Sequence, residues 1–303
     1  MQNYRLVNYT GVDGARAGLL VDGAVYDAAI CLGSPTPLRI MDILTAWEEL
    51  KPRIERAAPL GAAIPLAQAG LLAPLGAPAQ IYCAGANYAD HAAAMAAVNN
   101  TPLGPNPKEA GLKAWFFMKS PRSLANPGQT VTMPKAAKKV DWEAELAVVI
   151  GRVAKDVPVE RAYDYVAGYT IGNDLSARDL GRREGVPATS PFAMDWLAHK
   201  NFDGSLPLGP WIVPASDIAD PMNLAIKLTV NGALKQNSNS AAMIFSIADQ
   251  IAHLSQKLTL YPGDVIMTGT PAGTGNESGV FLNSGDVIAI TIDQLGELVT
   301  KVV

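Results

Sequence analysis

The sequence predicts an α+β protein in which a small mixed module precedes a larger, mostly β domain. Two observations support this prediction. Helical spacing of apolar residues is concentrated in two segments, and short strand patterns recur along most of the remaining chain. The 303 residues, 49% of them apolar, suffice for one large or two medium domains. We place the boundary at residue 78, so that residues 1–78 form the module and residues 79–303 the second domain.

The N-terminal module combines strand and helix patterns. Residues 4–9 and 17–26 have strand character, with glycine-containing turns at 12–14 and 22–23. Apolar residues at three- and four-residue steps predict a helix over 38–57. Residues 57–87 carry no charge and are long enough to cross a membrane, but four prolines interrupt the segment. We therefore expect a loop-rich connection there.

The second domain has mostly strand patterns. The predicted strands are 81–84, 114–118, 142–150, 166–173, 211–213, 224–230, 264–268 and 286–291. Asn231-Gly232 predicts a hairpin turn, and residues 243–257 have the apolar spacing of a helix. Residues 92–112 are predicted to be a long loop after a short helical start. Loops of this length are often lids or binding loops.

Composition and charge exclude several classes of protein. The net charge is −4 and there is no basic block, which argues against nucleic acid or an anionic membrane as partner. The first ten residues lack the pattern of a signal peptide, and Cys31 and Cys83 form no C-x-x-C pair. We therefore expect reduced thiols in a cytoplasmic protein. The three histidines have no ligand spacing, which argues against a zinc site.

The segment 140-VDWEAELAVVIG-151 carries an acid at every second residue: Asp141, Glu143 and Glu145. Alternate residues of a strand share a face and lie roughly 7 Å apart. A solvated acidic face is one interpretation. However, strands flanked by such apolar runs are usually buried, and buried carboxylates need a cation or protons. Oxygen ligands favour Mg²⁺, with Mn²⁺ or Ca²⁺ as alternatives, and Asp174 in the next apolar stretch supplies a third carboxylate.

Five segments in sequence order resemble the fumarylacetoacetate hydrolase family over roughly residues 80–303. Each segment alone is a weak pattern, but the ordered set is specific. They are 85-GANYADH-91, 141-DWEAELAVVIG-151, 168-GYTIGNDLSARD-179, 199-HKNFDGSLPLGP-210 and 263-GDVIMTGTPAGTG-275. The resemblance implies a mixed β-sandwich or β-roll, a homodimer, and a small-molecule substrate that is a 2-oxo acid or a 1,3-diketo acid.

The resemblance also assigns residues to roles. It implies that Glu143, Glu145 and Asp174 hold the metal, usually Mg²⁺. It further implies that His91 activates water and that Lys200 lies near the substrate oxygens.

Two further positions match family residues at the substrate. Thr270 matches a residue that hydrogen-bonds the substrate carboxylate, and Arg178 matches a position near the site. We expect Asp141 to be a rim group, paired with Lys138 or Lys139.

One departure from the family pattern affects the expected reaction. In acylpyruvase-like members a glutamate follows the histidine by three residues and completes a base dyad, whereas here that position is Ala94. An arginine often found before Asn-Tyr is replaced by Ala86. Asp90 or Glu109 could supply the missing acid, or the reaction could need no strong activation of water.

These alternatives give a ranked set of functions. Metal-dependent hydrolysis of a C–C bond comes first, and decarboxylation or isomerisation of a 2-oxo diacid, in the catabolism of aromatic compounds or sugar acids, is a close second. A protein that binds metal and ligand without turnover is third. A purely structural β-protein is the remaining class, and it would have no affinity for divalent metals.

Overall fold

The N-terminal residues form an antiparallel sheet with helices packed against one side. The computed structural model describes residues 1, 3–76 and 80–303, so the predicted boundary at residue 78 lies outside the described residues. The elements are β1 (Arg5–Gly11), β2 (Gly14–Val21), β3 (Ala24–Asp27), α1 (Ala28–Leu32), α2 (Ile40–Thr45), α3 (Trp47–Arg56), β4 (Ile64–Pro65) and β5 (Leu71–Leu72). The helix predicted over 38–57 is divided at Ala46, where the backbone leaves the helical region (φ −105°, ψ 29°).

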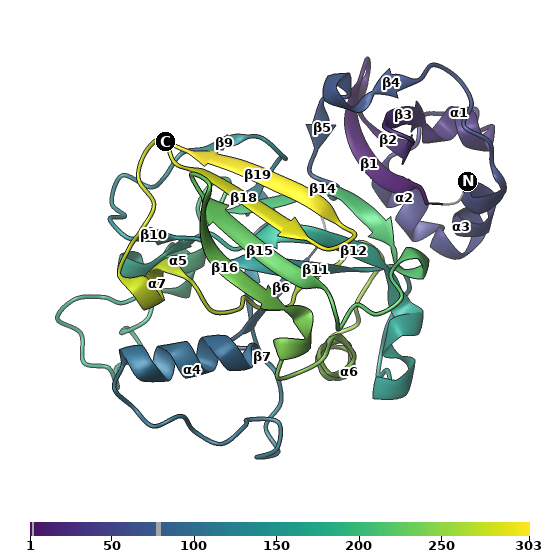
Figure 1. Ribbon diagram of the computed structural model, residues 1–303. Helices are drawn as coiled ribbons and strands as arrows, with labels where there is room; N and C mark the ends of the chain where they lie inside the picture. The colour runs from purple at the N-terminus through teal and green to yellow at the C-terminus, as the bar shows by residue number, and fades with distance from the viewer. Residues whose placement is uncertain (2, 77–79) are drawn as a thin grey trace.

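The strands of the module continue into the main sheet of the second domain. Strand β1 pairs with β14 (Leu206–Pro214) at Leu6 and Ile212, which joins the two parts by backbone hydrogen bonding. The sheet continues through β12 (Val166–Asn173), β11 (Ala144–Ile150), β17 (Val265–Met267), β6 (Ile81–Gly85) and β7 (Trp115–Lys119). Short β8 (Leu124–Ala125) also pairs with β14. Figure 1 shows the module beside the larger domain.

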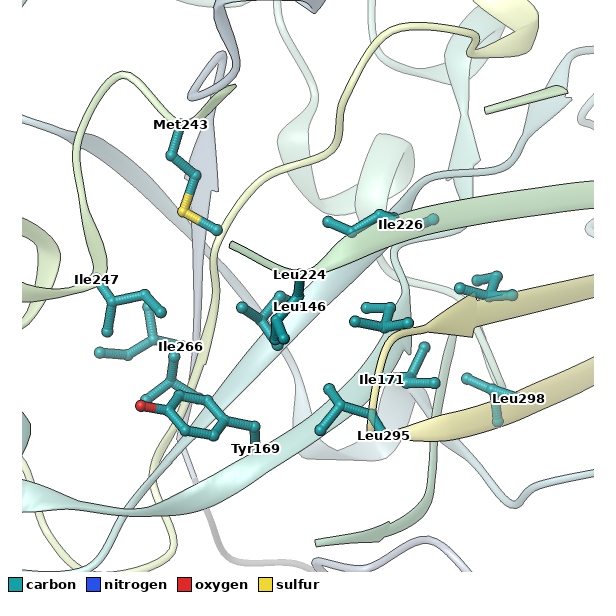
Figure 2. Packing of buried hydrophobic residues seen from close by; sticks show 14 of the residues in the cluster. Leu146, Tyr169, Ile171, Leu224, Ile226, Met243, Ile247, Ile266, Leu295 and Leu298 are labelled. Atoms are coloured by element: carbon teal, nitrogen blue, oxygen red, sulfur yellow. The ribbon is translucent and has the colours of Figure 1, made fainter. Parts of the chain in front are cut away.

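A second sheet packs against the main one and creates the larger core. Its order is β16 (Ala233–Asn239), β15 (Ala225–Val230), β18 (Val287–Ile292), β19 (Gly296–Val302) and β9 (Thr130–Val131). Leu146 and Ile171 of the main sheet meet Ile226 and Leu298 of the second sheet (Figure 2). Helix α6 (Ile247–Lys257) adds Ile247 to this core. This arrangement confirms the predicted α+β class with a mixed sandwich.

Strand β11 is buried on both faces. One face contributes to the core between the sheets, while Ala147 and Val149 on the other face pack with the module residues Ile43, Leu44 and Trp47. Buried on both faces, β11 has a continuous apolar run after its acidic start. Acidic residues at the beginning of such a strand are therefore buried in the protein interior.

The hairpin predicted at Asn231-Gly232 is present between β15 and β16. Both residues have positive φ, 50° and 79°, as a type I′ turn requires. Strand β16 escaped prediction because its sequence, ALKQNSN, is largely polar. The predicted loop over 92–112 begins later than expected, since helix α4 (Ala89–Val98) extends three turns from Tyr88. Within the described part of the chain, no helix combines the length and apolar character that a bilayer crossing requires.

The core between the sheets gives a direct test of this packing. Ile226 is fully buried on β15, whereas the next residue, Lys227, is exposed on the opposite face. We expect Ile226→Ala to lower the free energy of unfolding by about 2–5 kcal/mol because it removes buried methyl groups and leaves a cavity. Lys227→Ala should change it by less than about 0.5 kcal/mol. Urea denaturation checks both variants, and equal effects would contradict the assigned packing.

Candidate active site

Three carboxylates meet where β11 begins and β12 ends. The antiparallel register pairs Glu145 with Gly172, so Glu143 and Asp174 lie opposite each other just beyond the ladder. The backbone N–H of Asp174 donates to the carbonyl of Glu143 at 3.0 Å. One oxygen from each of Glu143, Glu145 and Asp174 lies within 4.8 Å of the others, and all three residues are buried. The structure therefore brings the three predicted ligands together.

Buried lysines neutralise two of these carboxylates. Lys200 Nζ donates to Glu143 Oε2 and to Asp174 Oδ2, both at 2.7 Å, and Lys119 Nζ donates to Asp174 Oδ1 at 2.6 Å. Burial alone would lower the pKa of Lys200, but Asp174 and Glu143 outweigh it and raise the pKa above its usual value. Lys200 is thus a permanent cation. Lys119 was not predicted from the sequence.

Glu145 is the carboxylate with the least compensation. Among the described residues its hydrogen-bond donor is the backbone N–H of Gly269, at 2.9 Å from Oε2. Burial, followed by the charges of Asp174 and Glu143, raises the pKa of Glu145 well above its usual value. The carboxylate therefore needs a positive partner to remain ionised in this position.

The local charge balance fits a bound cation. With every group ionised, four buried carboxylates would face three basic side chains within the described ranges, with one negative charge in excess. The acids are Asp141, Glu143, Glu145 and Asp174, and the bases are Lys119, Arg178 and Lys200. Oxygen donors in this number suit a hard divalent ion.

Asp141 binds an arginine and two backbone N–H groups, and within the described part of the chain it contacts no lysine. It lies on β10 (Val140–Asp141), which pairs with β13 (Ser176–Ala177) and is separate from β11. Its Oδ2 accepts from Arg178 Nε at 2.8 Å, and Arg178 also contacts Glu143. The prediction of a partner at Lys138 or Lys139 is wrong. The backbone N–H groups of those two residues bind Asp179 instead.

His91 has an acidic partner that the sequence reading missed. His91 Nδ1 lies 2.5 Å from Oε1 of Glu277, which is carried by α7 (Gly275–Ser278). Helix α7 lies beside α4, the helix that carries His91 (Figure 1). Burial would raise the pKa of Glu277, but the hydrogen bonds from His91 and from the backbone of Gly273 outweigh it and lower the pKa. Glu277 is therefore ionised at neutral pH.

Neither substitute acid considered from the sequence contacts His91 in this way. Asp90 accepts from the backbone N–H of His91 and from Ser238 Oγ, and Glu109 is exposed in the loop before β7. Asp141 positions Glu277, the acid that contacts His91. The carboxylate of Asp141 accepts from the N–H groups of Gly275 and Asn276 at 2.6 and 3.0 Å and so fixes the start of α7. The glycine run ending at Gly275 was the available signal, since Glu277 comes two residues after it.

These groups line one cavity of about 210 Å³. Its lining includes all the predicted site residues except the deeply buried Asp174. They are His91, Glu143, Glu145, Arg178, Lys200 and Thr270. Trp115, Phe117 and Trp196 form an aromatic wall, with Phe117 and Trp196 stacked at 5.7 Å between ring centroids. The cavity thus combines a charged floor with an aromatic side and has room for a small acid.

Thr270 is held by the protein itself. Its hydroxyl donates to the carbonyl of Ala144 at 2.9 Å and accepts from Gln236 Nε2 at 2.9 Å. A contact between this hydroxyl and a substrate carboxylate would require its proton to leave Ala144. The substrate-binding roles of Thr270 and Arg178 stay predictions.

A buried acidic triad beside a histidine–carboxylate pair defines an enzyme site, which a purely structural β-protein would not need. Residues 80–303 match the family described as Fumarylacetoacetate (FAA) hydrolase C-terminal. The chain belongs to this family, as its five segments predict.

Relatives and solved structures extend the match over the whole chain. The chain is 37% identical over 316 residues to the mitochondrial oxaloacetate tautomerase Fahd2a of Rattus norvegicus, covering 100% of this chain and 92% of the rat protein. A putative HpcE protein from Mycobacterium smegmatis is 32% identical, with a TM-score of 0.83 and 99% coverage of both chains. Maleylpyruvate hydrolase from Sphingobium sp. SYK-6, solved with manganese(II) and pyruvate, is 31% identical, with a TM-score of 0.76 and coverage of 99% and 98%.

These similarities refine two of the predictions. The family is one of enzymes, but its named members include both tautomerases and hydrolases, and the isomerase alternative gains more support than C–C hydrolysis. The expected cytoplasmic location is contradicted, because the rat, human and bovine relatives are named as mitochondrial proteins. The manganese complex and the acidic triad together indicate a divalent-metal site.

Proposed function

We propose that the protein is a keto–enol tautomerase for oxaloacetate or a closely related 2-oxo diacid. The observation that carries this proposal is that His91, which is paired with Glu277, lines the same small cavity as Glu143 and Glu145 of the acid triad. A base beside a polarised 2-oxo group can remove a proton from the neighbouring carbon. The full-length similarity to an oxaloacetate tautomerase supports this choice of substrate.

The histidine is arranged to act as the base. Ionised Glu277 accepts the Nδ1 proton of His91, which leaves Nε2 as the acceptor nitrogen of the neutral ring. In the keto-to-enol direction, Nε2 takes a proton from C3 of oxaloacetate, the C2–C3 double bond forms, and the imidazolium gives that proton to the C2 oxygen. The reverse direction returns the proton to C3. Glu277 stabilises the imidazolium that forms in between.

The charged floor would hold the 2-oxo acid end of the substrate. A divalent ion held by Glu143, Glu145 and Asp174, for which we propose Mg²⁺, would polarise the 2-oxo group and lower the cost of charge on its oxygen. Lys200 and Lys119 hold the carboxylates of this floor in place. The aromatic wall supplies an apolar surface on one side of the cavity.

Hydrolysis of a C–C bond is the second candidate. The His91–Glu277 pair restores the kind of base dyad that Ala94 had put in doubt, and such a dyad can also activate water. The structural neighbour named maleylpyruvate hydrolase supports this alternative.

One set of assays distinguishes the tautomerase from the C–C hydrolase. We expect the protein with Mg²⁺ to accelerate loss of the enol absorbance of freshly dissolved enolic oxaloacetate by at least about 100-fold, the lower end of general-base effects, and EDTA to remove the effect. Release of CO₂ and cleavage of an acylpyruvate are followed in parallel. Acylpyruvate cleavage without ketonisation would make the protein a hydrolase, and CO₂ release without ketonisation would make it a decarboxylase.

A further inference from the structure

His199 lines the catalytic cavity but has no part in the proposed proton transfer. It lies on α5 (Trp196–Lys200), which begins at Asp195, whose carboxylate accepts from the backbone N–H of Ala198 at 2.9 Å. The following residue, Lys200, is tied to the acid triad by two hydrogen bonds. The backbone of His199 is therefore fixed relative to the metal ligands.

The imidazole of His199 is held by packing against its neighbours and not by hydrogen bonds to the described residues. Neither ring nitrogen has a hydrogen-bond partner among the residues that the structure describes, although the side chain is buried. One face stacks on Trp196, with 5.4 Å between ring centroids. A Cβ placed on Gly181 would lie 2.9 Å from Cγ and Nδ1 of the ring. Glycine at 181 thus makes room for the imidazole, and Nε2 is the nitrogen turned away from it.

Burial and the nearby cations keep this ring neutral. Burial, followed by the charges of Lys200 and Arg178, lowers the pKa of His199 to about 3. A neutral imidazole retains one N–H donor and one acceptor nitrogen, and buried polar groups of this kind normally have a partner. A ligand in the cavity can supply that partner after a small shift of the side chains that cover the two nitrogens.

The charged donors of the floor are largely committed to carboxylates of the protein. Lys119, Lys200 and Arg178 are already paired with the carboxylates of the protein. Once the 2-oxo acid end of a diacid is held over the triad, its second carboxylate extends toward the cavity wall. His199, which precedes Lys200 in the chain and lines the same cavity, can donate to it without adding charge.

We propose that His199 determines substrate specificity by donating a ring N–H hydrogen bond to the distal carboxylate of a four-carbon 2-oxo diacid. This inference rests on the proposed function. It predicts discrimination between oxaloacetate and 2-oxobutanoate, which carries a methyl group in place of the distal carboxylate. Gly181 is then a positioning residue, since any side chain there displaces the imidazole.

His199→Phe tests the proposal because phenylalanine keeps the stacking on Trp196 and removes the N–H group. We expect KM for oxaloacetate to rise about 10- to 100-fold with kcat within about twofold, as for loss of a hydrogen bond to a charged group. The inhibition constant of 2-oxobutanoate should not change. Gly181→Ala should likewise raise KM for oxaloacetate and leave the inhibition constant of 2-oxobutanoate unchanged. His253→Phe is the matched control, since His253 also stacks on an aromatic ring and has an unpartnered Nδ1, but lies outside this cavity.

Calorimetric titration with both acids in the presence of Mg²⁺ separates this proposal from the tautomerase proposal. If the wild type prefers oxaloacetate and His199→Phe removes that preference, His199 has the proposed role even where no tautomerisation is seen. Equal weakening of both acids, an unchanged preference, or a wild type without preference would overturn it. Matching thermal unfolding midpoints of wild type and variant exclude misfolding as the cause.

Discussion

Replacing Glu145 by glutamine is expected to abolish divalent-metal binding and tautomerase activity together. Of the three proposed ligands, Glu145 has no basic side chain at hydrogen-bond distance among the described residues, whereas Glu143 and Asp174 are already paired with lysines. It therefore contributes the charge that most favours a cation. We expect the metal affinity to fall by more than about 100-fold, beyond the effect of substitutions outside the ligands themselves. Calorimetric titration with Mn²⁺ measures this loss, and the oxaloacetate assay measures the activity.

Stability in EDTA distinguishes a lost metal site from a misfolded protein. The neutral amide of Glu145→Gln removes repulsion between buried like charges, so the metal-free variant should be at least as stable as the metal-free wild type. Glu297→Ala, an exposed glutamate on β19, is the control that should alter neither property. Wild-type activity in Glu145→Gln would show that the site has been assigned to the wrong residues.

Replacing Glu277 by glutamine should lower kcat while leaving metal affinity unchanged. Glutamine has nearly the same shape but cannot offset the positive charge on His91 after proton transfer, and its amide N–H groups do not fix the required tautomer. We expect kcat to fall about 10- to 1000-fold with little change in KM. Stopped-flow measurement of enol decay gives both constants.

A double-mutant cycle shows whether the two residues act as one unit. Once His91→Ala has removed the base, adding Glu277→Gln should cost little more, because the acid works through the imidazole. Asn276→Ala on the same short helix is the matched control and should retain full activity. Independent, multiplicative losses in the double mutant would contradict the assigned pairing.

The convergence of the three carboxylates proposed as metal ligands could be predicted because its geometry is local. Glu143 and Glu145 are two residues apart, so alternation along a strand puts their side chains on one face. Asp174 follows a strand whose predicted bounds, 166–173, match β12. Asp141 shows the limit of that argument. The ladder is interrupted before Ala144, so the third acid joins a different strand pair and binds Arg178.

The remaining contacts of the site could not be predicted because they join distant parts of the chain. His91 and Glu277 are 186 residues apart, and no periodicity relates them. Lys119 ends an ordinary strand, and its burial depends on how β7 packs at the edge of the main sheet. The strand pairing between the N-terminal module and the second domain could not be predicted either, because the single pairing of Leu6 with Ile212 depends on tertiary structure.

The pairing of β1 with β14 also has a consequence for folding during synthesis. Strand β1 and its partners β2 and β5 are synthesised well before its third partner, β14, which begins at residue 206. At typical synthesis rates of about 5–20 residues per second, the end of β1 at Leu6 waits roughly 10 to 40 s for β14. An open strand edge that persists for this long is a site for pairing with other nascent chains. The yield of correctly folded protein should therefore depend on the speed of translation between residues 11 and 206.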